Sequence, residues 1–199
     1  IGGAPRCGTT SLHALLSSHP EVCPSVPKES CYFVDEGYYT PRYPQYRLPK
    51  YTADLGAGYQ RFFAHCRDRQ SLLLDSSPEY LYQKTILRVP ELISSSTLFV
   101  FIVRDPIERL FSWYKLQSGR YRRIRETYPQ FVDRLLSSKE PYPQYPNIAN
   151  SLRAGCYDQF LPSFVNVFGR SRVMVFPFEE LVSAGSSVSG DDFLFDEFD

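Results

Sequence analysis

The sequence has no excess of charge of either sign, because its 22 lysines and arginines balance its 22 aspartates and glutamates. A chain without a basic surplus gives no reason to expect nucleic acid or an anionic membrane surface as its partner. It also lacks any run close to the roughly 20 apolar residues that a membrane-spanning helix needs. An anion bound by this protein must therefore be held by a local group of residues.

Cysteine and histidine are scarce and scattered. The five cysteines and three histidines form no C-x-x-C pair and no spacing typical of metal ligands, so the sequence predicts no zinc site. One or two disulfides are compatible with five cysteines, but the odd number fixes no pairing. The first residue is Ile1 rather than methionine, and we expect a fragment that is truncated at both ends.

The chain is long enough, at 199 residues with 43% hydrophobic content, for one domain with a substantial core. Apolar runs predict strands, and apolar spacing of three and four predicts helices. Alternating strands and helices predict an α/β fold with a mostly parallel sheet, whose ligands bind at the carboxyl ends of the strands. The predicted strands cover residues 71–75, 98–103 and 172–176, with a short extended piece at 32–34, and the predicted helices cover 10–18, 59–65, 86–93, 106–116, 130–136 and 157–168.

Two stretches fall outside this pattern. Residues 38–51 are rich in tyrosine and proline, a composition that predicts a long loop without regular secondary structure. Residues 183–199 turn to serine and glycine and then to an acidic end, DDFLFDEFD. We expect one domain over residues 1–182, followed by a tail that is either disordered or the start of a further C-terminal segment.

The opening stretch GGAPRCGTTS is close to a phosphate-binding loop. Gly3 and Gly8 have the spacing of the Walker pattern, but Thr9 stands where that pattern has its lysine. Such glycines let the backbone approach an anion, and the helix that follows offers its positive end. Arg6 adds a full charge, and Thr9 and Thr10 add hydroxyl groups. The stretch predicts an anion-binding loop, with an ordinary strand-to-helix turn as the alternative.

A second group lies in FVFIVRDPIERLFSWYK. Arg104 follows the clearest strand and offers the bidentate fork that phosphates accept. Ser112 comes eight residues later, about two turns along the predicted helix. The alternative is a capping network in which Arg104 pairs with Asp105 or Glu108.

A third group is the proline-bounded PKESCYF. Glu29 near a phosphate-binding loop can deprotonate a hydroxyl, and Lys28 can neutralise charge on a leaving group. Judged on composition alone, a solvated lysine–glutamate pair is the default interpretation.

These stretches, with LDSSPEYL and CYDQFLPSFVNVFGRSRVMVFPFEEL, occur in an order that resembles the PAPS-dependent sulfotransferases, especially the Golgi carbohydrate group that sulfates heparan and chondroitin chains. The resemblance implies a P-loop-like three-layer α/β fold with a central, mostly parallel sheet flanked by helices. It also implies 3′-phosphoadenosine 5′-phosphosulfate (PAPS) as co-substrate and no metal.

The resemblance further assigns roles to individual residues. Glu29 matches the general base, Arg6 matches the basic residue beside the leaving group, and Arg104 with Ser112 matches the pair that holds the 3′-phosphate. The 5′-phosphosulfate is gripped by the loop residues Pro5, Arg6, Cys7, Gly8, Thr9 and Thr10.

By the same resemblance, the acceptor is a carbohydrate or glycosaminoglycan hydroxyl or amine, and the protein is a Golgi-lumen type II membrane glycoprotein anchored upstream of Ile1. Several relatives carry a lysine before their T-P element, where this chain has Ser76 and Ser77. Tyr157 matches a tyrosine close to the acceptor cleft. Nothing after Val182 resembles the basic loop with which relatives close over the nucleotide.

Two other functions remain open at this point. One is a P-loop kinase or nucleotidase that uses ATP and magnesium, against which the missing Walker lysine counts. The other is a noncatalytic module that binds a nucleotide. The sequence fixes neither the acceptor nor the oligomeric state.

Overall fold

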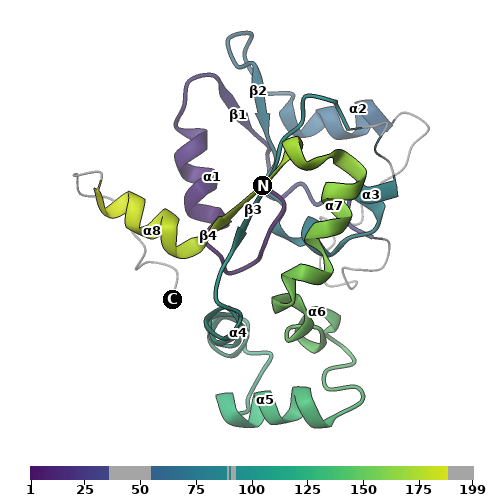
Figure 1. Ribbon diagram of the computed structural model, residues 1–199, viewed down its shortest axis with the longest axis vertical. Coiled ribbons are helices and arrows are strands. Elements are labelled where there is room, and N and C mark those ends of the chain that lie inside the picture. Colours follow the sequence, from purple (N-terminus) through teal and green to yellow (C-terminus); the bar gives the residue numbers. More distant parts are fainter. Residues whose placement is uncertain (36–54, 89, 91–92, 188–199) are drawn as a thin grey trace. The chain divides into compact units, whose positions relative to one another are not determined.

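The computed structural model describes residues 1–35, 55–88, 90 and 93–187 (Figure 1). The irregular loop predicted at 38–51 lies outside these residues. The part of the predicted tail from residue 188 onward also lies outside them. The strands are β1 (Val22–Pro24), β2 (Leu72–Leu74), β3 (Phe99–Val103) and β4 (Val173–Pro177), and the α-helices are α1 (Thr9–Ser17), α2 (Leu55–Gln60), α3 (Thr85–Arg88), α4 (Pro106–Lys115), α5 (Tyr128–Ser137), α6 (Pro146–Ala149), α7 (Leu161–Phe168) and α8 (Phe178–Ser187).

The chain forms two compact units, each built from two segments. The first unit contains residues 1–103 and 159–176, and the second contains residues 104–158 with the described part of 177–199. All four strands belong to the first unit, apart from the final Pro177 of β4. The anion-binding loop and the Lys28–Glu29 pair therefore lie in the first unit, and Arg104 and Ser112 lie in the second.

The strands of the first unit form two pairs that the N-terminal segment connects. β1 and β2 are parallel, with Cys23 opposite Leu73, and β3 pairs with β4. The Ile1 ammonium donates to the carbonyl oxygen of Asp75 at 2.6 Å, and Gly3 forms a parallel bridge with Phe101. Figure 1 shows the β3 and β4 arrows running in the same direction. The expected α/β arrangement with parallel strands is present.

Individual strand predictions had different outcomes. β2, β3 and β4 lie where the apolar runs predicted them, but Leu72 and Leu73 of β2 are more than half exposed rather than buried. β1 was not predicted, because three residues that include a proline give no periodic signal. The extended piece predicted at 32–34 is wrong: the chain turns there, with the Val34 amide donating to the carbonyl oxygen of Cys31 at 3.3 Å.

Aromatic side chains fill the interior of the first unit. Phe99 and Phe101 of β3 contact Phe164 of α7, and Phe99 also contacts Phe168 one turn further along. The spacing of the apolar residues in α7 therefore reflects a helix face that packs on β3. A second aromatic group surrounds the turn at 32–34 and consists of Tyr32, Phe33, Tyr59, Phe62, Phe63 and Tyr80.

The second unit has its own core, formed mainly by α4, α5 and α6. The side chain of Asp105 caps α4 by accepting from the amides of Ile107 and Glu108, at 2.9 and 3.0 Å. Thr127 and Gln130 form a capping box at the start of α5. The buried residues of this core are Leu110, Ile124, Phe131, Leu135, Tyr142 and Ile148.

Cys23 and Cys66 form a disulfide that spans 43 residues, so the cysteines supply one cross-link within the first unit. Cys7, Cys31 and Cys156 are not in disulfides. Among the residues described, no helix is both long enough and apolar enough to cross a membrane.

Phe131 is fully buried in the second core, so Phe131→Ala should lower the free energy of unfolding by about 3–5 kcal/mol. Leu136 lies on the same helix with 70% of its surface exposed, and Leu136→Ala is the matched control, with an expected change within about 0.5 kcal/mol. Urea unfolding followed by circular dichroism measures both. Equal losses in the two variants would contradict the assignment of this core.

Candidate functional site

The loop between Gly3, which forms a bridge with β3, and the start of α1 has the backbone geometry of an anion site. The Ala4 amide donates to the carbonyl oxygen of Ile102 at 2.7 Å, which fixes the start of the loop against β3. Arg6 and Gly8 have φ values of 70° and 77°, and Gly8 is the N-cap of α1. Because the first amides of a helix have no acceptor within the helix, the start of α1 offers donors to a ligand.

The two glycines of this loop serve different purposes. Gly8 occupies the left-handed region that glycine adopts without strain. Gly3 is required by packing, because a Cβ there would lie 2.8 Å from Cβ of Leu81 and 3.2 Å from the carbonyl oxygen of Pro78. The spacing that resembles the Walker pattern thus combines one conformational and one packing constraint.

The loop side chains divide into buried and accessible ones. Cys7 is fully buried, its amide donates to the carbonyl oxygen of Ala4 at 3.2 Å, and its thiol lies 3.8 Å from the carbonyl oxygen of Pro5. Thr9 is only 5% exposed, whereas Thr10 is exposed. The Cys7 amide is already engaged with Ala4, whereas Thr9 can meet a ligand through its backbone amide and Thr10 through its hydroxyl group.

Lys28 and Glu29 lie beside the start of α1. The Lys28 ammonium donates to Oγ1 of Thr10 at 2.9 Å and lies 3.5 Å from Oε1 of Glu29. Burial lowers the pKa of Lys28, and the neighbouring Glu29 opposes that shift. The structure thus brings together three residues that the sequence assigned to two separate motifs.

The segment that carries Lys28 and Glu29 is fixed at both ends. The Ser25 amide donates to the carbonyl oxygen of Leu74 at 2.8 Å, and the Ser25 hydroxyl donates to the carbonyl oxygen of Lys28 at 2.8 Å. At the other end, the hydroxyl of Ser30 donates to Oδ2 of Asp75 at 2.6 Å. The end of β2 therefore sets the position of Glu29.

Asp75 accepts hydrogen bonds from hydroxyl groups of several segments. Its Oδ2 accepts from Ser30, from Tyr59 at 3.0 Å and from Tyr80 at 2.9 Å, and its Oδ1 accepts from Ser77 at 2.7 Å. Burial and this carboxylate together raise the pKa of Tyr59 and of Tyr80 well above the ordinary tyrosine value. This network was not predicted from the sequence, where its local signal is an aspartate at the end of the predicted strand 71–75.

His13 contacts the residue next to this network. Its Nδ1 lies 2.7 Å from Oγ of Ser76. Burial, followed by the charges of Lys28 and the Ile1 ammonium, lowers the pKa of His13. A neutral imidazole bonded to Ser76 agrees with a structural role for His13.

In the second unit, Arg104 is held from several sides. Its Nη2 lies 3.6 Å from Oε2 of Glu108, and its guanidinium carbon lies 4.7 Å from the centre of the Phe178 ring. The Tyr157 hydroxyl donates to the carbonyl oxygen of Arg104 at 3.0 Å. Nε of Arg104 is buried and has no hydrogen-bond partner within the described residues.

The alternative interpretation of Arg104 is therefore correct in part. Asp105 caps α4 and Glu108 pairs with Arg104, as a capping network requires. The buried Nε of Arg104 still leaves a donor for a ligand. Ser112 lies on α4, on the helix that begins directly after Arg104 and Asp105. The Tyr157 hydroxyl supports the backbone of Arg104, a contact between residues 53 positions apart that no local pattern predicts.

His13 should make stability depend on pH, because its folded-state pKa lies below the unfolded value of 6.5. Above that value both states hold a neutral imidazole, and as the pH falls below it the unfolded chain binds a proton that the folded chain disfavours. The urea concentration at the unfolding midpoint should therefore decrease as the pH is lowered from 7.5 to 5.5. The decrease should be smaller in His13→Asn than in the wild type. The exposed His19 provides the control, and His19→Asn should retain the wild-type dependence; a His13→Asn curve that coincides with wild type would contradict this account.

Comparisons with known proteins agree with the geometry. A model of the Sulfotransferase family matches residues 1–186. The crystal structure of a sulfotransferase from Alicyclobacillus acidocaldarius is similar, with a TM-score of 0.75 and 27% identity over 94% of this chain and 75% of that one. This similarity supports the P-loop-like α/β fold that the sequence predicted.

Two curated relatives are also similar in sequence. The bifunctional heparan sulfate N-deacetylase/N-sulfotransferase 2 of Bos taurus is 23% identical over 183 residues, and that of Homo sapiens is 22% identical over 182 residues. Each match covers 91% of this chain, which spans 20% of the length of either relative. The family model matches nearly the whole chain, including the loop, the Lys28–Glu29 pair and Arg104. This chain therefore belongs to the Sulfotransferase family.

Proposed function

We propose that the protein transfers a sulfuryl group from PAPS to a hydroxyl or amine of a carbohydrate acceptor. The observation that carries the proposal is the hydrogen bond from Lys28 to Thr10, because it supports a proposed acid–base pair, Lys28 and Glu29, beside the proposed anion-binding loop. The family match supports sulfuryl transfer, and the names of the bovine and human relatives support a carbohydrate acceptor.

The loop of the first unit is suited to the phosphosulfate. The amides at the start of α1 donate toward a ligand, Gly8 admits it closely, and Arg6 supplies a full positive charge. A Walker lysine serves the β- and γ-phosphates of a triphosphate, which a phosphosulfate lacks. In this chain Lys28 reaches Thr10 from another segment and supplies a cation there.

The reaction is an in-line displacement at sulfur. The acceptor oxygen or nitrogen forms a bond to sulfur while Glu29 takes its proton, and the bond from sulfur to the bridging oxygen breaks. The electron pair of that bond remains on the departing phosphate of 3′,5′-ADP. Lys28, Arg6 and the loop amides stabilise the negative charge that accumulates there, and the lowered pKa of Lys28 favours proton donation to the leaving oxygen.

Arg104 and Ser112 form the second anion site of the proposal, for the 3′-phosphate of the nucleotide. Nε of Arg104 is a buried donor that a phosphate oxygen would satisfy. Contact with Phe178 and the Tyr157 hydrogen bond hold this arginine in a restricted position, which lowers the entropy lost on binding. A triphosphate would not require this second site.

The remaining expectations belong to the same proposal. A glycosaminoglycan is the acceptor suggested by the relatives' names, and sulfuryl transfer by these residues requires no metal. The proposal includes residence in the Golgi lumen as a type II membrane protein.

The direct test of the proposed reaction is transfer of labelled sulfate from PAPS to a panel of glycans by the complete gene product. Magnesium-dependent ATP turnover without sulfate transfer would instead indicate a kinase or nucleotidase, and 3′,5′-ADP binding without transfer would indicate a binding module.

Replacing the proposed base should remove transfer and keep binding. Glu29→Gln retains the size and hydrogen-bonding ability of the side chain but cannot accept the proton, so sulfate transfer should fall at least about 100-fold. Its affinity for 3′,5′-ADP, measured by calorimetry, should change by less than about threefold, or 0.6 kcal/mol. Glu21→Gln, an exposed glutamate of the same unit, is the control. Unchanged turnover in Glu29→Gln would remove Glu29 from the mechanism.

Loss of Arg104 should weaken nucleotide binding. A charge-assisted hydrogen bond contributes about 1.5–3 kcal/mol, so Arg104→Ala should weaken 3′,5′-ADP binding by roughly 10- to 150-fold. A nucleotide without the 3′-phosphate, adenosine 5′-phosphosulfate, should lose much less affinity from the same substitution. Arg120→Ala removes an exposed arginine of the same unit and should change neither value. Equal losses for the two nucleotides would show that Arg104 does not contact the 3′-phosphate.

A further inference from the structure

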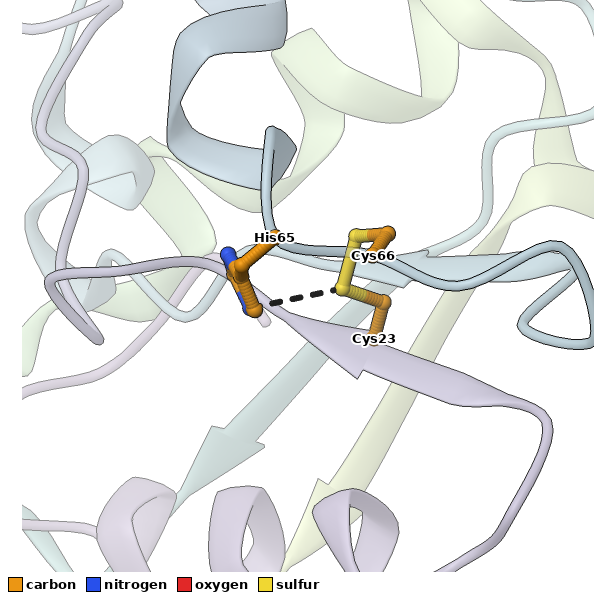
Figure 2. Close-up of side chains that lie close together, drawn as sticks. All are labelled: Cys23, His65 and Cys66. Carbon is orange, nitrogen blue, oxygen red and sulfur yellow. Dashed lines mark hydrogen bonds between the residues drawn. A yellow bond between two sulfur atoms is a disulfide. The ribbon is translucent and has the colours of Figure 1, made fainter.

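Cys23, His65 and Cys66 meet at a place that the proposed transfer reaction does not use (Figure 2). Cys23 is buried in β1, whereas Cys66 is partly and His65 largely exposed, a short distance after the 3₁₀ turn Arg61–Phe63. Cys23 and Cys66 form the disulfide, and Nε2 of His65 lies 3.5 Å from Sγ of Cys23. The three donor atoms all lie within 4.8 Å of one another.

The backbone holds these residues together independently of the disulfide. The Val26 amide, just after β1, donates to the carbonyl oxygen of Phe62 at 2.9 Å. The Gln70 side chain donates to the carbonyl oxygen of Val22 at 2.8 Å, and the Cys66 amide donates to the carbonyl oxygen of Phe63 at 2.9 Å. Breaking the sulfur–sulfur bond would therefore leave both cysteines and His65 side by side.

The reduced cluster would present two thiolates and one imidazole. This donor set favours Zn²⁺ and related thiophilic divalent ions over magnesium or calcium. With Zn–S near 2.3 Å and Zn–N near 2.0–2.1 Å, a tetrahedral ion places sulfur about 3.6 Å from nitrogen and about 3.8 Å from a second sulfur. The distance from Cys23 Sγ to His65 Nε2 is already 3.5 Å. The Cα atoms of the two cysteines are 5.7 Å apart, so rotation of the side chains can separate the sulfurs.

We propose that Cys23, His65 and Cys66 bind one Zn²⁺-class ion when the disulfide is reduced, with water as the fourth ligand. Reduction adds two electrons and two protons to the disulfide and yields two thiols. A dithiol supplies both as it is oxidised to a disulfide, whereas a phosphine supplies the electrons, water supplies the protons, and the phosphine leaves as its oxide. Metal binding then releases the two thiol protons. The first unit would thus be cross-linked either by a disulfide or by a metal ion. The sequence showed no such site because its ligands come from segments 43 residues apart.

Cobalt(II) is the probe for this site, because thiolate coordination gives it a charge-transfer absorption in the near ultraviolet. The purified chain is reduced anaerobically with a phosphine, freed of reductant and titrated with Co²⁺, with circular dichroism to follow folding. One Co²⁺ should bind per chain with a thiolate band, Zn²⁺ should displace it, and the oxidised chain should show no band. A reduced, folded chain without the band would overturn the proposal, as would a chain that unfolds on reduction and does not refold with Zn²⁺.

Variants identify the ligands. Cys66→Ser should remove one thiolate and reduce the charge-transfer intensity. His65→Ala removes a direct ligand, so it should weaken Co²⁺ binding by at least about 10- to 100-fold, the usual cost of losing a residue that only supports a ligand. Cys156→Ser and His19→Ala change a cysteine and a histidine outside the cluster and should bind Co²⁺ as the wild type does. Binding that is insensitive to His65→Ala and Cys66→Ser, or that is lost in Cys156→Ser, would place the metal elsewhere and refute the assignment.

Discussion

The partly buried carboxylate of Asp75 is the interaction on which the first unit depends. It accepts hydrogen bonds from the nearby Ser77 and Tyr80 hydroxyls and from those of Ser30 and Tyr59, which lie on other segments of the sequence. A charge removed from water is tolerated only when hydrogen bonds replace its hydration, so each of these hydroxyls has a restricted position. Because Ser30 follows Glu29 directly, the carboxylate that orders the interior also orders the proposed catalytic segment.

The part of the fold that the sequence predicted is the part with local signals. The apolar run of β3, the proline at the first position of α4 and the glycines around Arg6 each reflect a constraint that neighbouring residues impose. The full Asp75 network could not be predicted, because Ser30 and Tyr59 reach this carboxylate only after folding. The turn at 32–34 was mistaken for extended chain for a similar reason: its aromatic residues are buried by distant partners rather than by a strand.

The same distinction applies to the candidate site. Arg6, Lys28, Glu29 and Arg104 were found from residue type and motif order, but their surroundings were not. Lys28 reaches Thr10, and the Tyr157 hydroxyl supports the backbone of Arg104, through contacts between residues that are 18 and 53 positions apart. Motif patterns therefore identify the charged groups, whereas tertiary contacts lower the pKa of Lys28 and determine the position of Arg104.

Magnitudes decide between the two interpretations of Arg104. Its pair with Glu108 is 3.6 Å long and involves a carboxylate that is 61% exposed, so it contributes about 0–1 kcal/mol. A buried donor left without an acceptor, such as Nε of Arg104, costs about 1–3 kcal/mol. An anion that satisfies Nε can therefore gain more than the loss of the Glu108 pair would cost. The capping network is compatible with the proposed phosphate site, because the Glu108 pair involves Nη2 and leaves Nε as a donor.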